Sequence, residues 1–229
     1  MGSVTQSLLK FFRRGGSSDP SQPRELGIRS RRHSTAFKEF MRSVGREEGL
    51  SFLDLGATSA TNIKLLTEQG HKLRTEDLLG SSFEPEFYST GEGGVKTIDV
   101  EKFLKDNLQF HGQQFDAVFF WDIADYLPEP LVKPVIEKIF VSMKPGGMLL
   151  AFFHTKDAGP EAPYSRYHIA GEDALDLQPL MVNNGAGASA LVKLQRVFNN
   201  RHIENLFRDY ASLKFFLARD NMREVLVVR

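Results

Sequence analysis

Acidic side chains follow two neighbouring apolar runs of the 229-residue sequence. Asp54 lies near the end of the run 50–55, and the residues after it are small: Gly56, Ala57 and Thr58. A carboxylate at this point can accept hydrogen bonds from an ammonium group, and small residues let a ligand approach the backbone at a helix start. Glu76 and Asp77 close the next run, where an acidic side chain can bind both hydroxyls of a ribose. We therefore predict a ligand site where these two runs end.

A second group of residues could accept or donate a proton. Asp122, Asp125 and Tyr126 follow the strongly apolar run that ends at Trp121, and His154 follows a later apolar run. Carboxylate, phenol and imidazole groups are the usual general acids and bases of enzymes. We predict Asp122, Tyr126 and His154 as catalytic residues. The alternatives are an acidic cluster at a helix N-terminus and a buried structural histidine.

The elements that must position these residues alternate between strand and helix from residue 50 to residue 153. We expect strands at 50–55, 71–75, 95–98, 115–121 and 148–153, and helices at 61–69, 100–108 and 131–143. A helix capped by Ser34 or Thr35 precedes them, and a helix at 199–207 leads into two final strands, 210–217 and 223–228. This order predicts an α/β fold with helices on both faces of a mostly parallel seven-stranded sheet, closed by a C-terminal antiparallel hairpin.

Three stretches of the sequence match motifs of a known family. Residues 54–60 (DLGATSA) resemble the pattern D/E-x-G-x-G-x-G, and residues 115–122 (FDAVFFWD) are similar to the family's fourth strand. Residues 144–150 (KPGGMLL) match the turn L-x-P-G-G-x-L into the fifth strand. From residue 34 to residue 229, the chain thus resembles the class I, S-adenosylmethionine-dependent methyltransferases, whose sheet is Rossmann-like.

The resemblance implies a site for S-adenosyl-L-methionine. It places Asp54 and Gly56, with Ala57 and Thr58, at the methionine end, Glu76 or Asp77 at the ribose, Asp99 near the adenine amino group, and Trp121 with Asp122 beside the reacting methyl. Other roles stay open for the same residues. Asp54 and Asp99 could cap the helices that follow them, Glu76 and Asp77 could form a solvated turn, and Trp121 could serve only for packing.

The function that follows from the resemblance is methyl transfer to an unidentified small-molecule acceptor. Thr58 and Ala60 stand where the family usually has glycine, which leaves less room for the backbone turn. The alternative is therefore a catalytically inactive, methyltransferase-like module that binds or scaffolds a partner. A nicotinamide dehydrogenase would need G-x-G-x-x-G from Gly56, and both Thr58 and Thr61 break that pattern.

Residues 1–33 differ in composition from the rest of the chain. Residues 1–33 hold seven basic and two acidic side chains, a net charge of +5, and residues 15–23 are rich in Gly, Ser and Pro. We expect a basic, flexible arm at 1–33, which could contact nucleic acid or an acidic surface, before a methyltransferase domain at 34–229. The irregular segment 155–197 is predicted to be a lid over the acceptor site.

Composition narrows the classes of protein further. The chain has no cysteine, which excludes disulfides and thiolate metal sites, and the six histidines form no i, i+4 pair, so we expect no metal. No apolar run reaches the length needed to span a bilayer. The absence of cysteine fits a reducing compartment, and we expect a cytoplasmic protein.

Overall fold

The computed structural model describes residues 24–25, 30–45, 47–158, 162–183, 189–218 and 220–229. Residues 1–23, which make up most of the predicted basic arm, lie outside the described residues. Among the described residues, the helices are all too short or too polar to cross a membrane.

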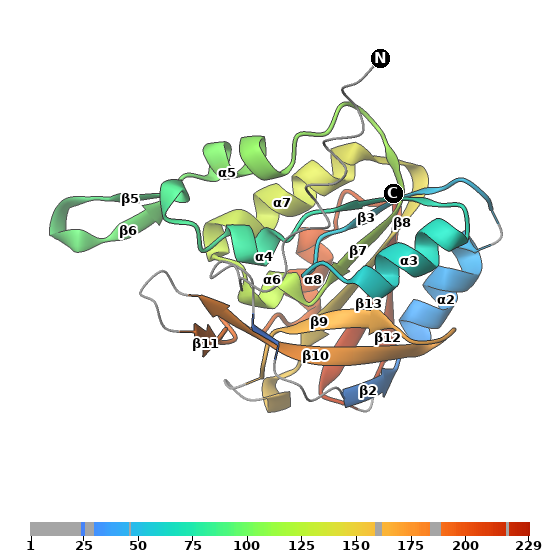
Figure 1. Ribbon diagram of the computed structural model, residues 1–229. Coiled ribbons are helices and arrows are strands. Elements are labelled where there is room, and N and C mark those ends of the chain that lie inside the picture. The colour runs from blue at the N-terminus through green and yellow to red at the C-terminus, as the bar shows by residue number, and fades with distance from the viewer. Residues whose placement is uncertain (1–23, 26–29, 46, 159–161, 184–188, 219) are drawn as a thin grey trace, which may run out of the picture.

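A six-stranded sheet forms the centre of the molecule, in the order β12-β13-β8-β7-β3-β4 (Figure 1). Its strands are β12 (Ser212–Leu217), β13 (Met222–Val228), β8 (Met143–His154), β7 (Phe115–Trp121), β3 (Ser51–Asp54) and β4 (Lys72–Thr75). The strands from β8 to β4 run parallel, and β13 runs antiparallel to both of its neighbours. The predicted α/β fold with a parallel-rich sheet is therefore confirmed.

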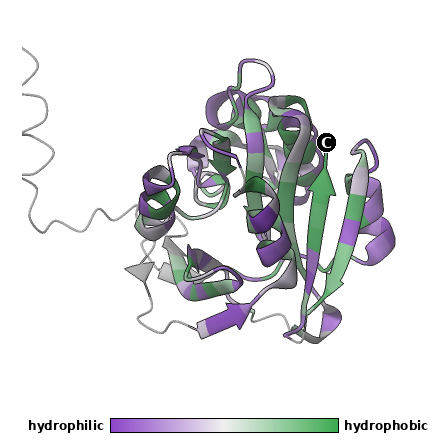
Figure 2. Ribbon diagram, turned by 90° about the vertical axis from the view of Figure 1, so that its right-hand side faces the viewer, coloured by the Kyte–Doolittle hydropathy of each residue, from purple (hydrophilic) through white to green (hydrophobic). Residues whose placement is uncertain are grey.

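Helices cover both faces of this sheet because its strands are apolar on both sides. α2 (Thr35–Val44) and α3 (Ala60–Glu68) pack on one face, over Phe52, Phe119 and Leu150. The other face is covered by α5 (Val100–Asn107), α7 (Glu129–Ser142) and α8 (Asn200–Leu206). Its side chains come from the strand residues that alternate with those of the first face. Figure 2 shows the apolar residues concentrated in the strands of the sheet.

The prediction of seven strands in one sheet was wrong for the part of the chain that the structure describes. The expected strand 95–98 forms as β6 (Lys96–Ile98), but it pairs with β5 (Tyr88–Thr90) in a separate two-stranded sheet. Gly93 and Gly94 take positive φ angles and turn the chain back, so that β6 meets a partner close in sequence. The hairpin extends away from the central sheet (Figure 1).

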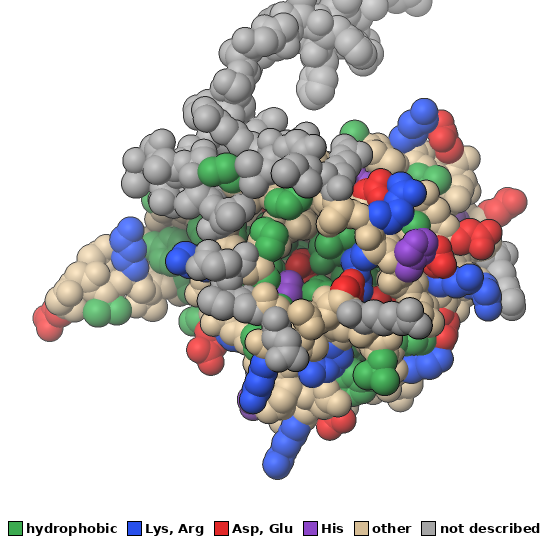
Figure 3. All heavy atoms as spheres, turned by 90° about the horizontal axis from the view of Figure 1, so that it is seen from below, with side chains coloured by type: hydrophobic (Ala, Val, Ile, Leu, Met, Phe, Trp, Pro, Cys, Tyr) green, Lys and Arg blue, Asp and Glu red, His purple; other side chains and the backbone are tan. Residues whose placement is uncertain are grey.

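A second sheet lies across the lower edge of the molecule (Figure 1). Its long strand β10 (Ala174–Asn183) pairs antiparallel with β9 (Ser165–Ile169), β11 (Ser189–Leu191), β1 (Arg24–Glu25) and β2 (Ser30–His33). Charged side chains of both signs lie interspersed on this face of the molecule (Figure 3). The expected irregular segment 155–197 contains the strands β9, β10 and β11. β1 and β2, which fall within the predicted arm 1–33, pair with β10 in this sheet.

Smaller differences concern the elements next to the candidate site. The predicted turn 144–147 forms a bulge inside β8, where the register with β7 jumps between Phe115 and Ala117. Two short helices were not expected: α4 (Leu78–Ser81) after β4 and α6 (Ile123–Tyr126) after β7. Both begin where a parallel strand ends, and they direct the chain away from the carboxyl edge of the sheet.

Candidate active site

Asp54 lies at the carboxyl end of β3 and is almost completely buried. Its carboxylate accepts hydrogen bonds from the Gly56 backbone N–H (3.1 Å), from Asn62 Nδ2 (3.4 Å) and from Trp121 Nε1 (2.7 Å). Burial raises the pKa of Asp54 to about 6, although these donors oppose the shift. The carboxylate that was expected to meet a ligand ammonium group is therefore bound to groups of the protein.

The indole of Trp121 lies against Gly56, the first of the small residues that follow β3. A Cβ added to Gly56 would lie 2.5 Å from Trp121 Cδ1, so only glycine allows the ring to lie this close. The indole stacks between the rings of Phe119 and Tyr167, with centroids 4.7 Å away on each side and interplanar angles of 6° and 4°. The sequence predicts that a ligand lies close to the backbone at Gly56. In the structure, the Trp121 side chain lies there.

Residues 164–169, which we call the strap, close this region from the other side. Tyr164 Oη accepts a hydrogen bond from the Ala57 backbone N–H (3.2 Å). Ser59 Oγ lies 2.9 Å from His168 Nδ1, and the same hydroxyl caps α3 by accepting from a backbone N–H. The strap thus contacts backbone and side chains at the start of α3, where a free helix N-terminus would bind an anion or a polar ligand.

Asn62, in the first turn of α3, fixes the strap more firmly. Its Nδ2 donates to the Tyr167 carbonyl oxygen (2.9 Å), and its Oδ1 accepts from the Ile169 backbone N–H (2.8 Å). β9 accordingly runs directly along α3 (Figure 1). Sequence reasoning missed Asn62. The available signal was a polar residue on the apolar side of a short helix.

A cluster of ionisable groups lies at the carboxyl ends of β7 and β8. His154 donates its backbone N–H to Asp125 Oδ2 (2.6 Å), and its ring Nδ1 lies 2.9 Å from the same oxygen. Burial lowers the pKa of His154, but the neighbouring carboxylates of Asp125 and Asp122 outweigh it and raise the pKa above its usual value. Because Asp125 accepts from Nδ1–H, the other ring nitrogen is the one that can exchange a proton.

Two oxygens in this cluster are buried without a hydrogen-bond partner among the described residues: Asp122 Oδ1 and Asp125 Oδ1. Burial raises the pKa of Asp122 to about 6. Tyr126 is also buried, donates to the Ala162 carbonyl oxygen (3.0 Å), and has a pKa that burial raises. The phenol therefore stays protonated. Asp122 and the Asp125–His154 pair are the groups of this cluster that can take up a proton.

The remaining predicted cofactor ligands form local contacts. Asp77 caps α4 by accepting from the Gly80 backbone N–H (2.9 Å), and Asp99 caps α5 through the Lys102 backbone N–H (2.9 Å). Glu76 pairs with Arg74 at 2.7 Å. Thr58 is exposed and lies outside the buried group. The ribose and adenine roles of these residues stay predictions.

The Trp121 indole occupies the space beside Gly56, where the resemblance would place S-adenosylmethionine. The types of side chain suit the cofactor, since a buried carboxylate and a row of small residues meet at the strand ends. The space is filled, however, because the indole lies against Gly56 and its N–H binds Asp54. Among the described residues, no three acidic or histidine side chains form a group that could hold a metal ion.

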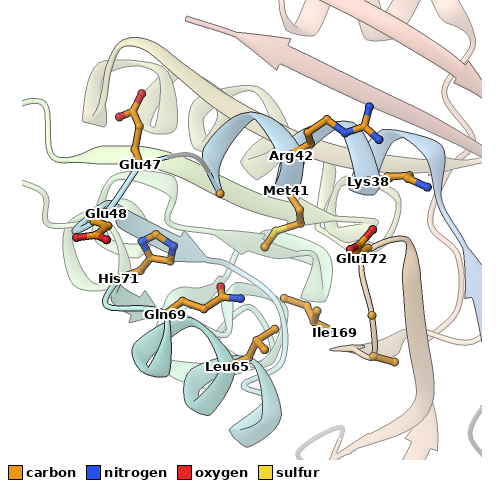
Figure 4. A pocket seen from close by; sticks show the side chains of 13 residues that line it. Lys38, Met41, Arg42, Glu47, Glu48, Leu65, Gln69, His71, Ile169 and Glu172 are labelled. Atoms are coloured by element: carbon orange, nitrogen blue, oxygen red, sulfur yellow. The ribbon is translucent and has the colours of Figure 1, made fainter.

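A separate groove lies between α2 and α3, with a cavity volume of about 820 Å³ (Figure 4). One of the residues that line it is His71, which precedes β4 and therefore stands at the amino edge of the sheet. His71 is buried, packs against Phe52, and leaves Nδ1 without a partner among the described residues. The groove is thus distinct from the residues gathered at the carboxyl edge.

No family model and no curated protein matches the sequence. Solved structures match most of the chain at low identity. The PH0226 protein of Pyrococcus horikoshii is 14% identical over 84% of this chain and 88% of its own, with a TM-score of 0.49. The 1,6-didemethyltoxoflavin-N1-methyltransferase of Burkholderia thailandensis is 14% identical over 85% and 76%, with a TM-score of 0.47. A SAM-dependent methyltransferase of Methanosarcina mazei is 14% identical over 82% and 96%, with a TM-score of 0.46.

Since these scores lie below 0.5, the fold assignment rests on topology. The parallel strands lie side by side in the order β4-β3-β7-β8, with motif residues at the ends of β3 and β7. β13 lies antiparallel between β8 and β12. The described residues therefore form a Rossmann-like α/β fold of the kind that the sequence resemblance predicts.

Proposed function

We propose that this protein is an S-adenosylmethionine-dependent methyltransferase that acts on a small-molecule acceptor. The observation that carries the proposal is the meeting of Asp54, Asp122 and His154 at the carboxyl edge of β3, β7 and β8. Ligands of open α/β sheets bind at this edge. All three side chains are buried, which favours an acceptor small enough to be enclosed.

The roles of the chain's own residues follow from their contacts. S-adenosylmethionine, when bound, supplies an already activated methyl group, so the protein has to align the acceptor, exclude water and accept a proton. His154 is the proposed proton acceptor, and Asp125 holds its ring through Nδ1. Asp122, with one oxygen unpartnered, is the proposed partner for a polar group of the acceptor. The strap excludes water from the cluster.

The alternative is an inactive methyltransferase-like module, and one observation favours it. Trp121 and Tyr164 already use the groups that would bind the cofactor, the carboxylate of Asp54 and the backbone N–H of Ala57. If the Trp121 indole never left its place beside Gly56, the cofactor could not bind there, and the domain could act only by binding or scaffolding a partner. The two readings differ in one property, which is whether the region beside Gly56 can open.

Calorimetric titration with S-adenosylmethionine and S-adenosylhomocysteine separates the two functions. We expect micromolar binding by the wild-type protein and its loss in Asp54→Asn, which keeps the shape of the side chain but removes its charge. Asp106→Asn makes the same chemical change on the exposed side of α5 and should bind normally. Equal binding by both variants would contradict the assigned site. Failure of both ligands to bind even after Trp121 is replaced would favour the inactive module.

A further inference from the structure

Trp121 has a backbone conformation that is rare for its residue type. Its φ angle is +47°, in the left-handed region that bulky side chains seldom adopt. Such strain persists only where the surroundings hold it, and it is concentrated at functional sites. Trp121 is the last residue of β7, and its indole lies against Gly56, just beyond the end of β3.

The surroundings of the ring explain why this conformation is held. The indole N–H donates to Asp54 at 2.7 Å, and both ring faces stack on aromatic side chains. One of the stacked rings belongs to Tyr167 of the strap. The indole is 2% exposed, so it lies inside the protein and not across an open entrance.

The strap and the indole form one closed unit. Tyr167 covers the indole, Tyr164 binds the Ala57 N–H, and Asn62 ties the strap backbone to α3. A ligand that enters beside Gly56 has to displace the indole, and departure of the indole breaks its stacking contact with Tyr167 of the strap. Displacement of the ring and loosening of the strap are therefore coupled.

We propose that Trp121 determines whether the cofactor can bind, because its indole occupies the position beside Asp54 and Gly56 in the closed protein and must leave before a ligand enters. This inference rests on the proposed function. Under this proposal, the Trp121 indole N–H competes with the ammonium group of the ligand for the Asp54 carboxylate.

Fluorescence tests the proposal directly because Trp121 is the only tryptophan of the sequence. Without ligand, we expect a blue-shifted emission and weak quenching by acrylamide, as for a buried indole. Saturating S-adenosylhomocysteine should shift the emission to the red and increase the quenching. Tyr164→Phe removes the hydrogen bond from the Ala57 N–H and leaves Trp121 intact, so it should increase quenching without ligand. An exposed indole in the ligand-free wild-type protein would overturn the proposal.

Variants of Trp121 provide the second test. Trp121→Ser removes the competing ring, and Trp121→Phe keeps the stack but removes the N–H donor to Asp54. If the closed form outnumbers the open form about tenfold, removing the ring should tighten S-adenosylhomocysteine binding by about tenfold. The phenylalanine variant should show a smaller gain. Thermal melts establish whether each variant is folded. If the Trp121→Ser variant does not fold, the test uses Trp121→Phe alone.

The outcomes separate this proposal from the function on which it rests. Tighter binding by the Trp121 variants supports it, including the case where the wild-type protein does not bind detectably. Wild-type binding with unchanged emission and quenching overturns control by Trp121 and leaves methyl transfer standing. No binding by the wild-type protein or by either variant overturns both, because removal of the ring then uncovers no cofactor site.

Discussion

Replacing Arg32 by methionine tests whether the strand β2 is part of the folded domain or of a detachable arm. The Arg32 guanidinium is 6% exposed and binds Asp220 Oδ2 at 2.7 Å and Glu224 Oε1 at 2.8 Å. It also lies over the ring of Phe152, 4.6 Å from the centroid. These contacts join β2 to β13 and to the region just before it, so they link residues near the two ends of the described chain.

The size of the effect follows from burial of the partner charges. Removing one member of a buried ion pair leaves the other charge buried without a partner, which lowers the free energy of unfolding by about 3–5 kcal/mol. Glu224 is 1% exposed but keeps a hydrogen bond from the Ala36 N–H, and Asp220 is 41% exposed on its side chain. We therefore expect the lower end, about 3 kcal/mol. For a domain of this size, that lowers the Tm by about 6–12 °C.

Urea unfolding followed by circular dichroism measures this loss as a shift of the midpoint at constant slope. Arg31→Met is the matched control, because Arg31 pairs with Asp176 on the exposed side of the same strand and has a side chain 59% exposed. It should cost less than about 1 kcal/mol. Adding Glu224→Gln to Arg32→Met should recover part of the loss. Equal, small losses for Arg31→Met and Arg32→Met would refute the assignment of β2 to the domain.

Three further predictions concern buried ionisable groups. Burial raises the pKa of Asp122 to about 6, above that of an unfolded aspartate, so stability falls as pH rises from about 4 to about 6. Asp122→Asn should therefore stabilise the protein at pH 7 and not at pH 4 in thermal melts; equal effects at both pH values would contradict this. For His154, whose folded pKa is raised, the stability gain is complete below the unfolded pKa and is lost as pH rises through the folded one. Asp125→Asn should lower the His154 pKa in an NMR titration, and an unchanged value would contradict the pair. His71→Phe removes an unpartnered nitrogen and should stabilise the protein by about 1 kcal/mol in urea unfolding, whereas a loss would indicate a partner for the imidazole.

Much of the central domain could be predicted from local pattern. The apolar run that forms β7 is buried on both faces, so its composition alone predicts a central parallel strand. The α2 helix begins at Ser34, whose hydroxyl accepts from the Phe37 N–H, and its buried residues follow the helical period. The positions of Asp54, Asp122 and His154 at strand ends follow from the same patterns. Their convergence required only that the strands be parallel neighbours.

Sequence patterns failed where partners distant in the chain decide the structure. The strands β9 and β10 carry polar residues such as His168 and Gln178, which are buried because they bind each other at 2.9 Å. Strand 95–98 was predicted correctly as a strand, but its place outside the central sheet depends on the local hairpin with β5. Pairing of β2 with β10 joins segments about 140 residues apart, which no local pattern indicates.

The sequence by itself determined the class of fold and which residues stand at the carboxyl edge of the sheet, because burial periodicity and strand ends are local properties. Only the tertiary structure decided how those residues are used. Asp77 and Asp99 cap helices, while the Asp54 carboxylate binds the Trp121 indole. A glycine that admits a ligand also admits a neighbouring ring, and which of them lies there depends on packing across β7, the strap and α3.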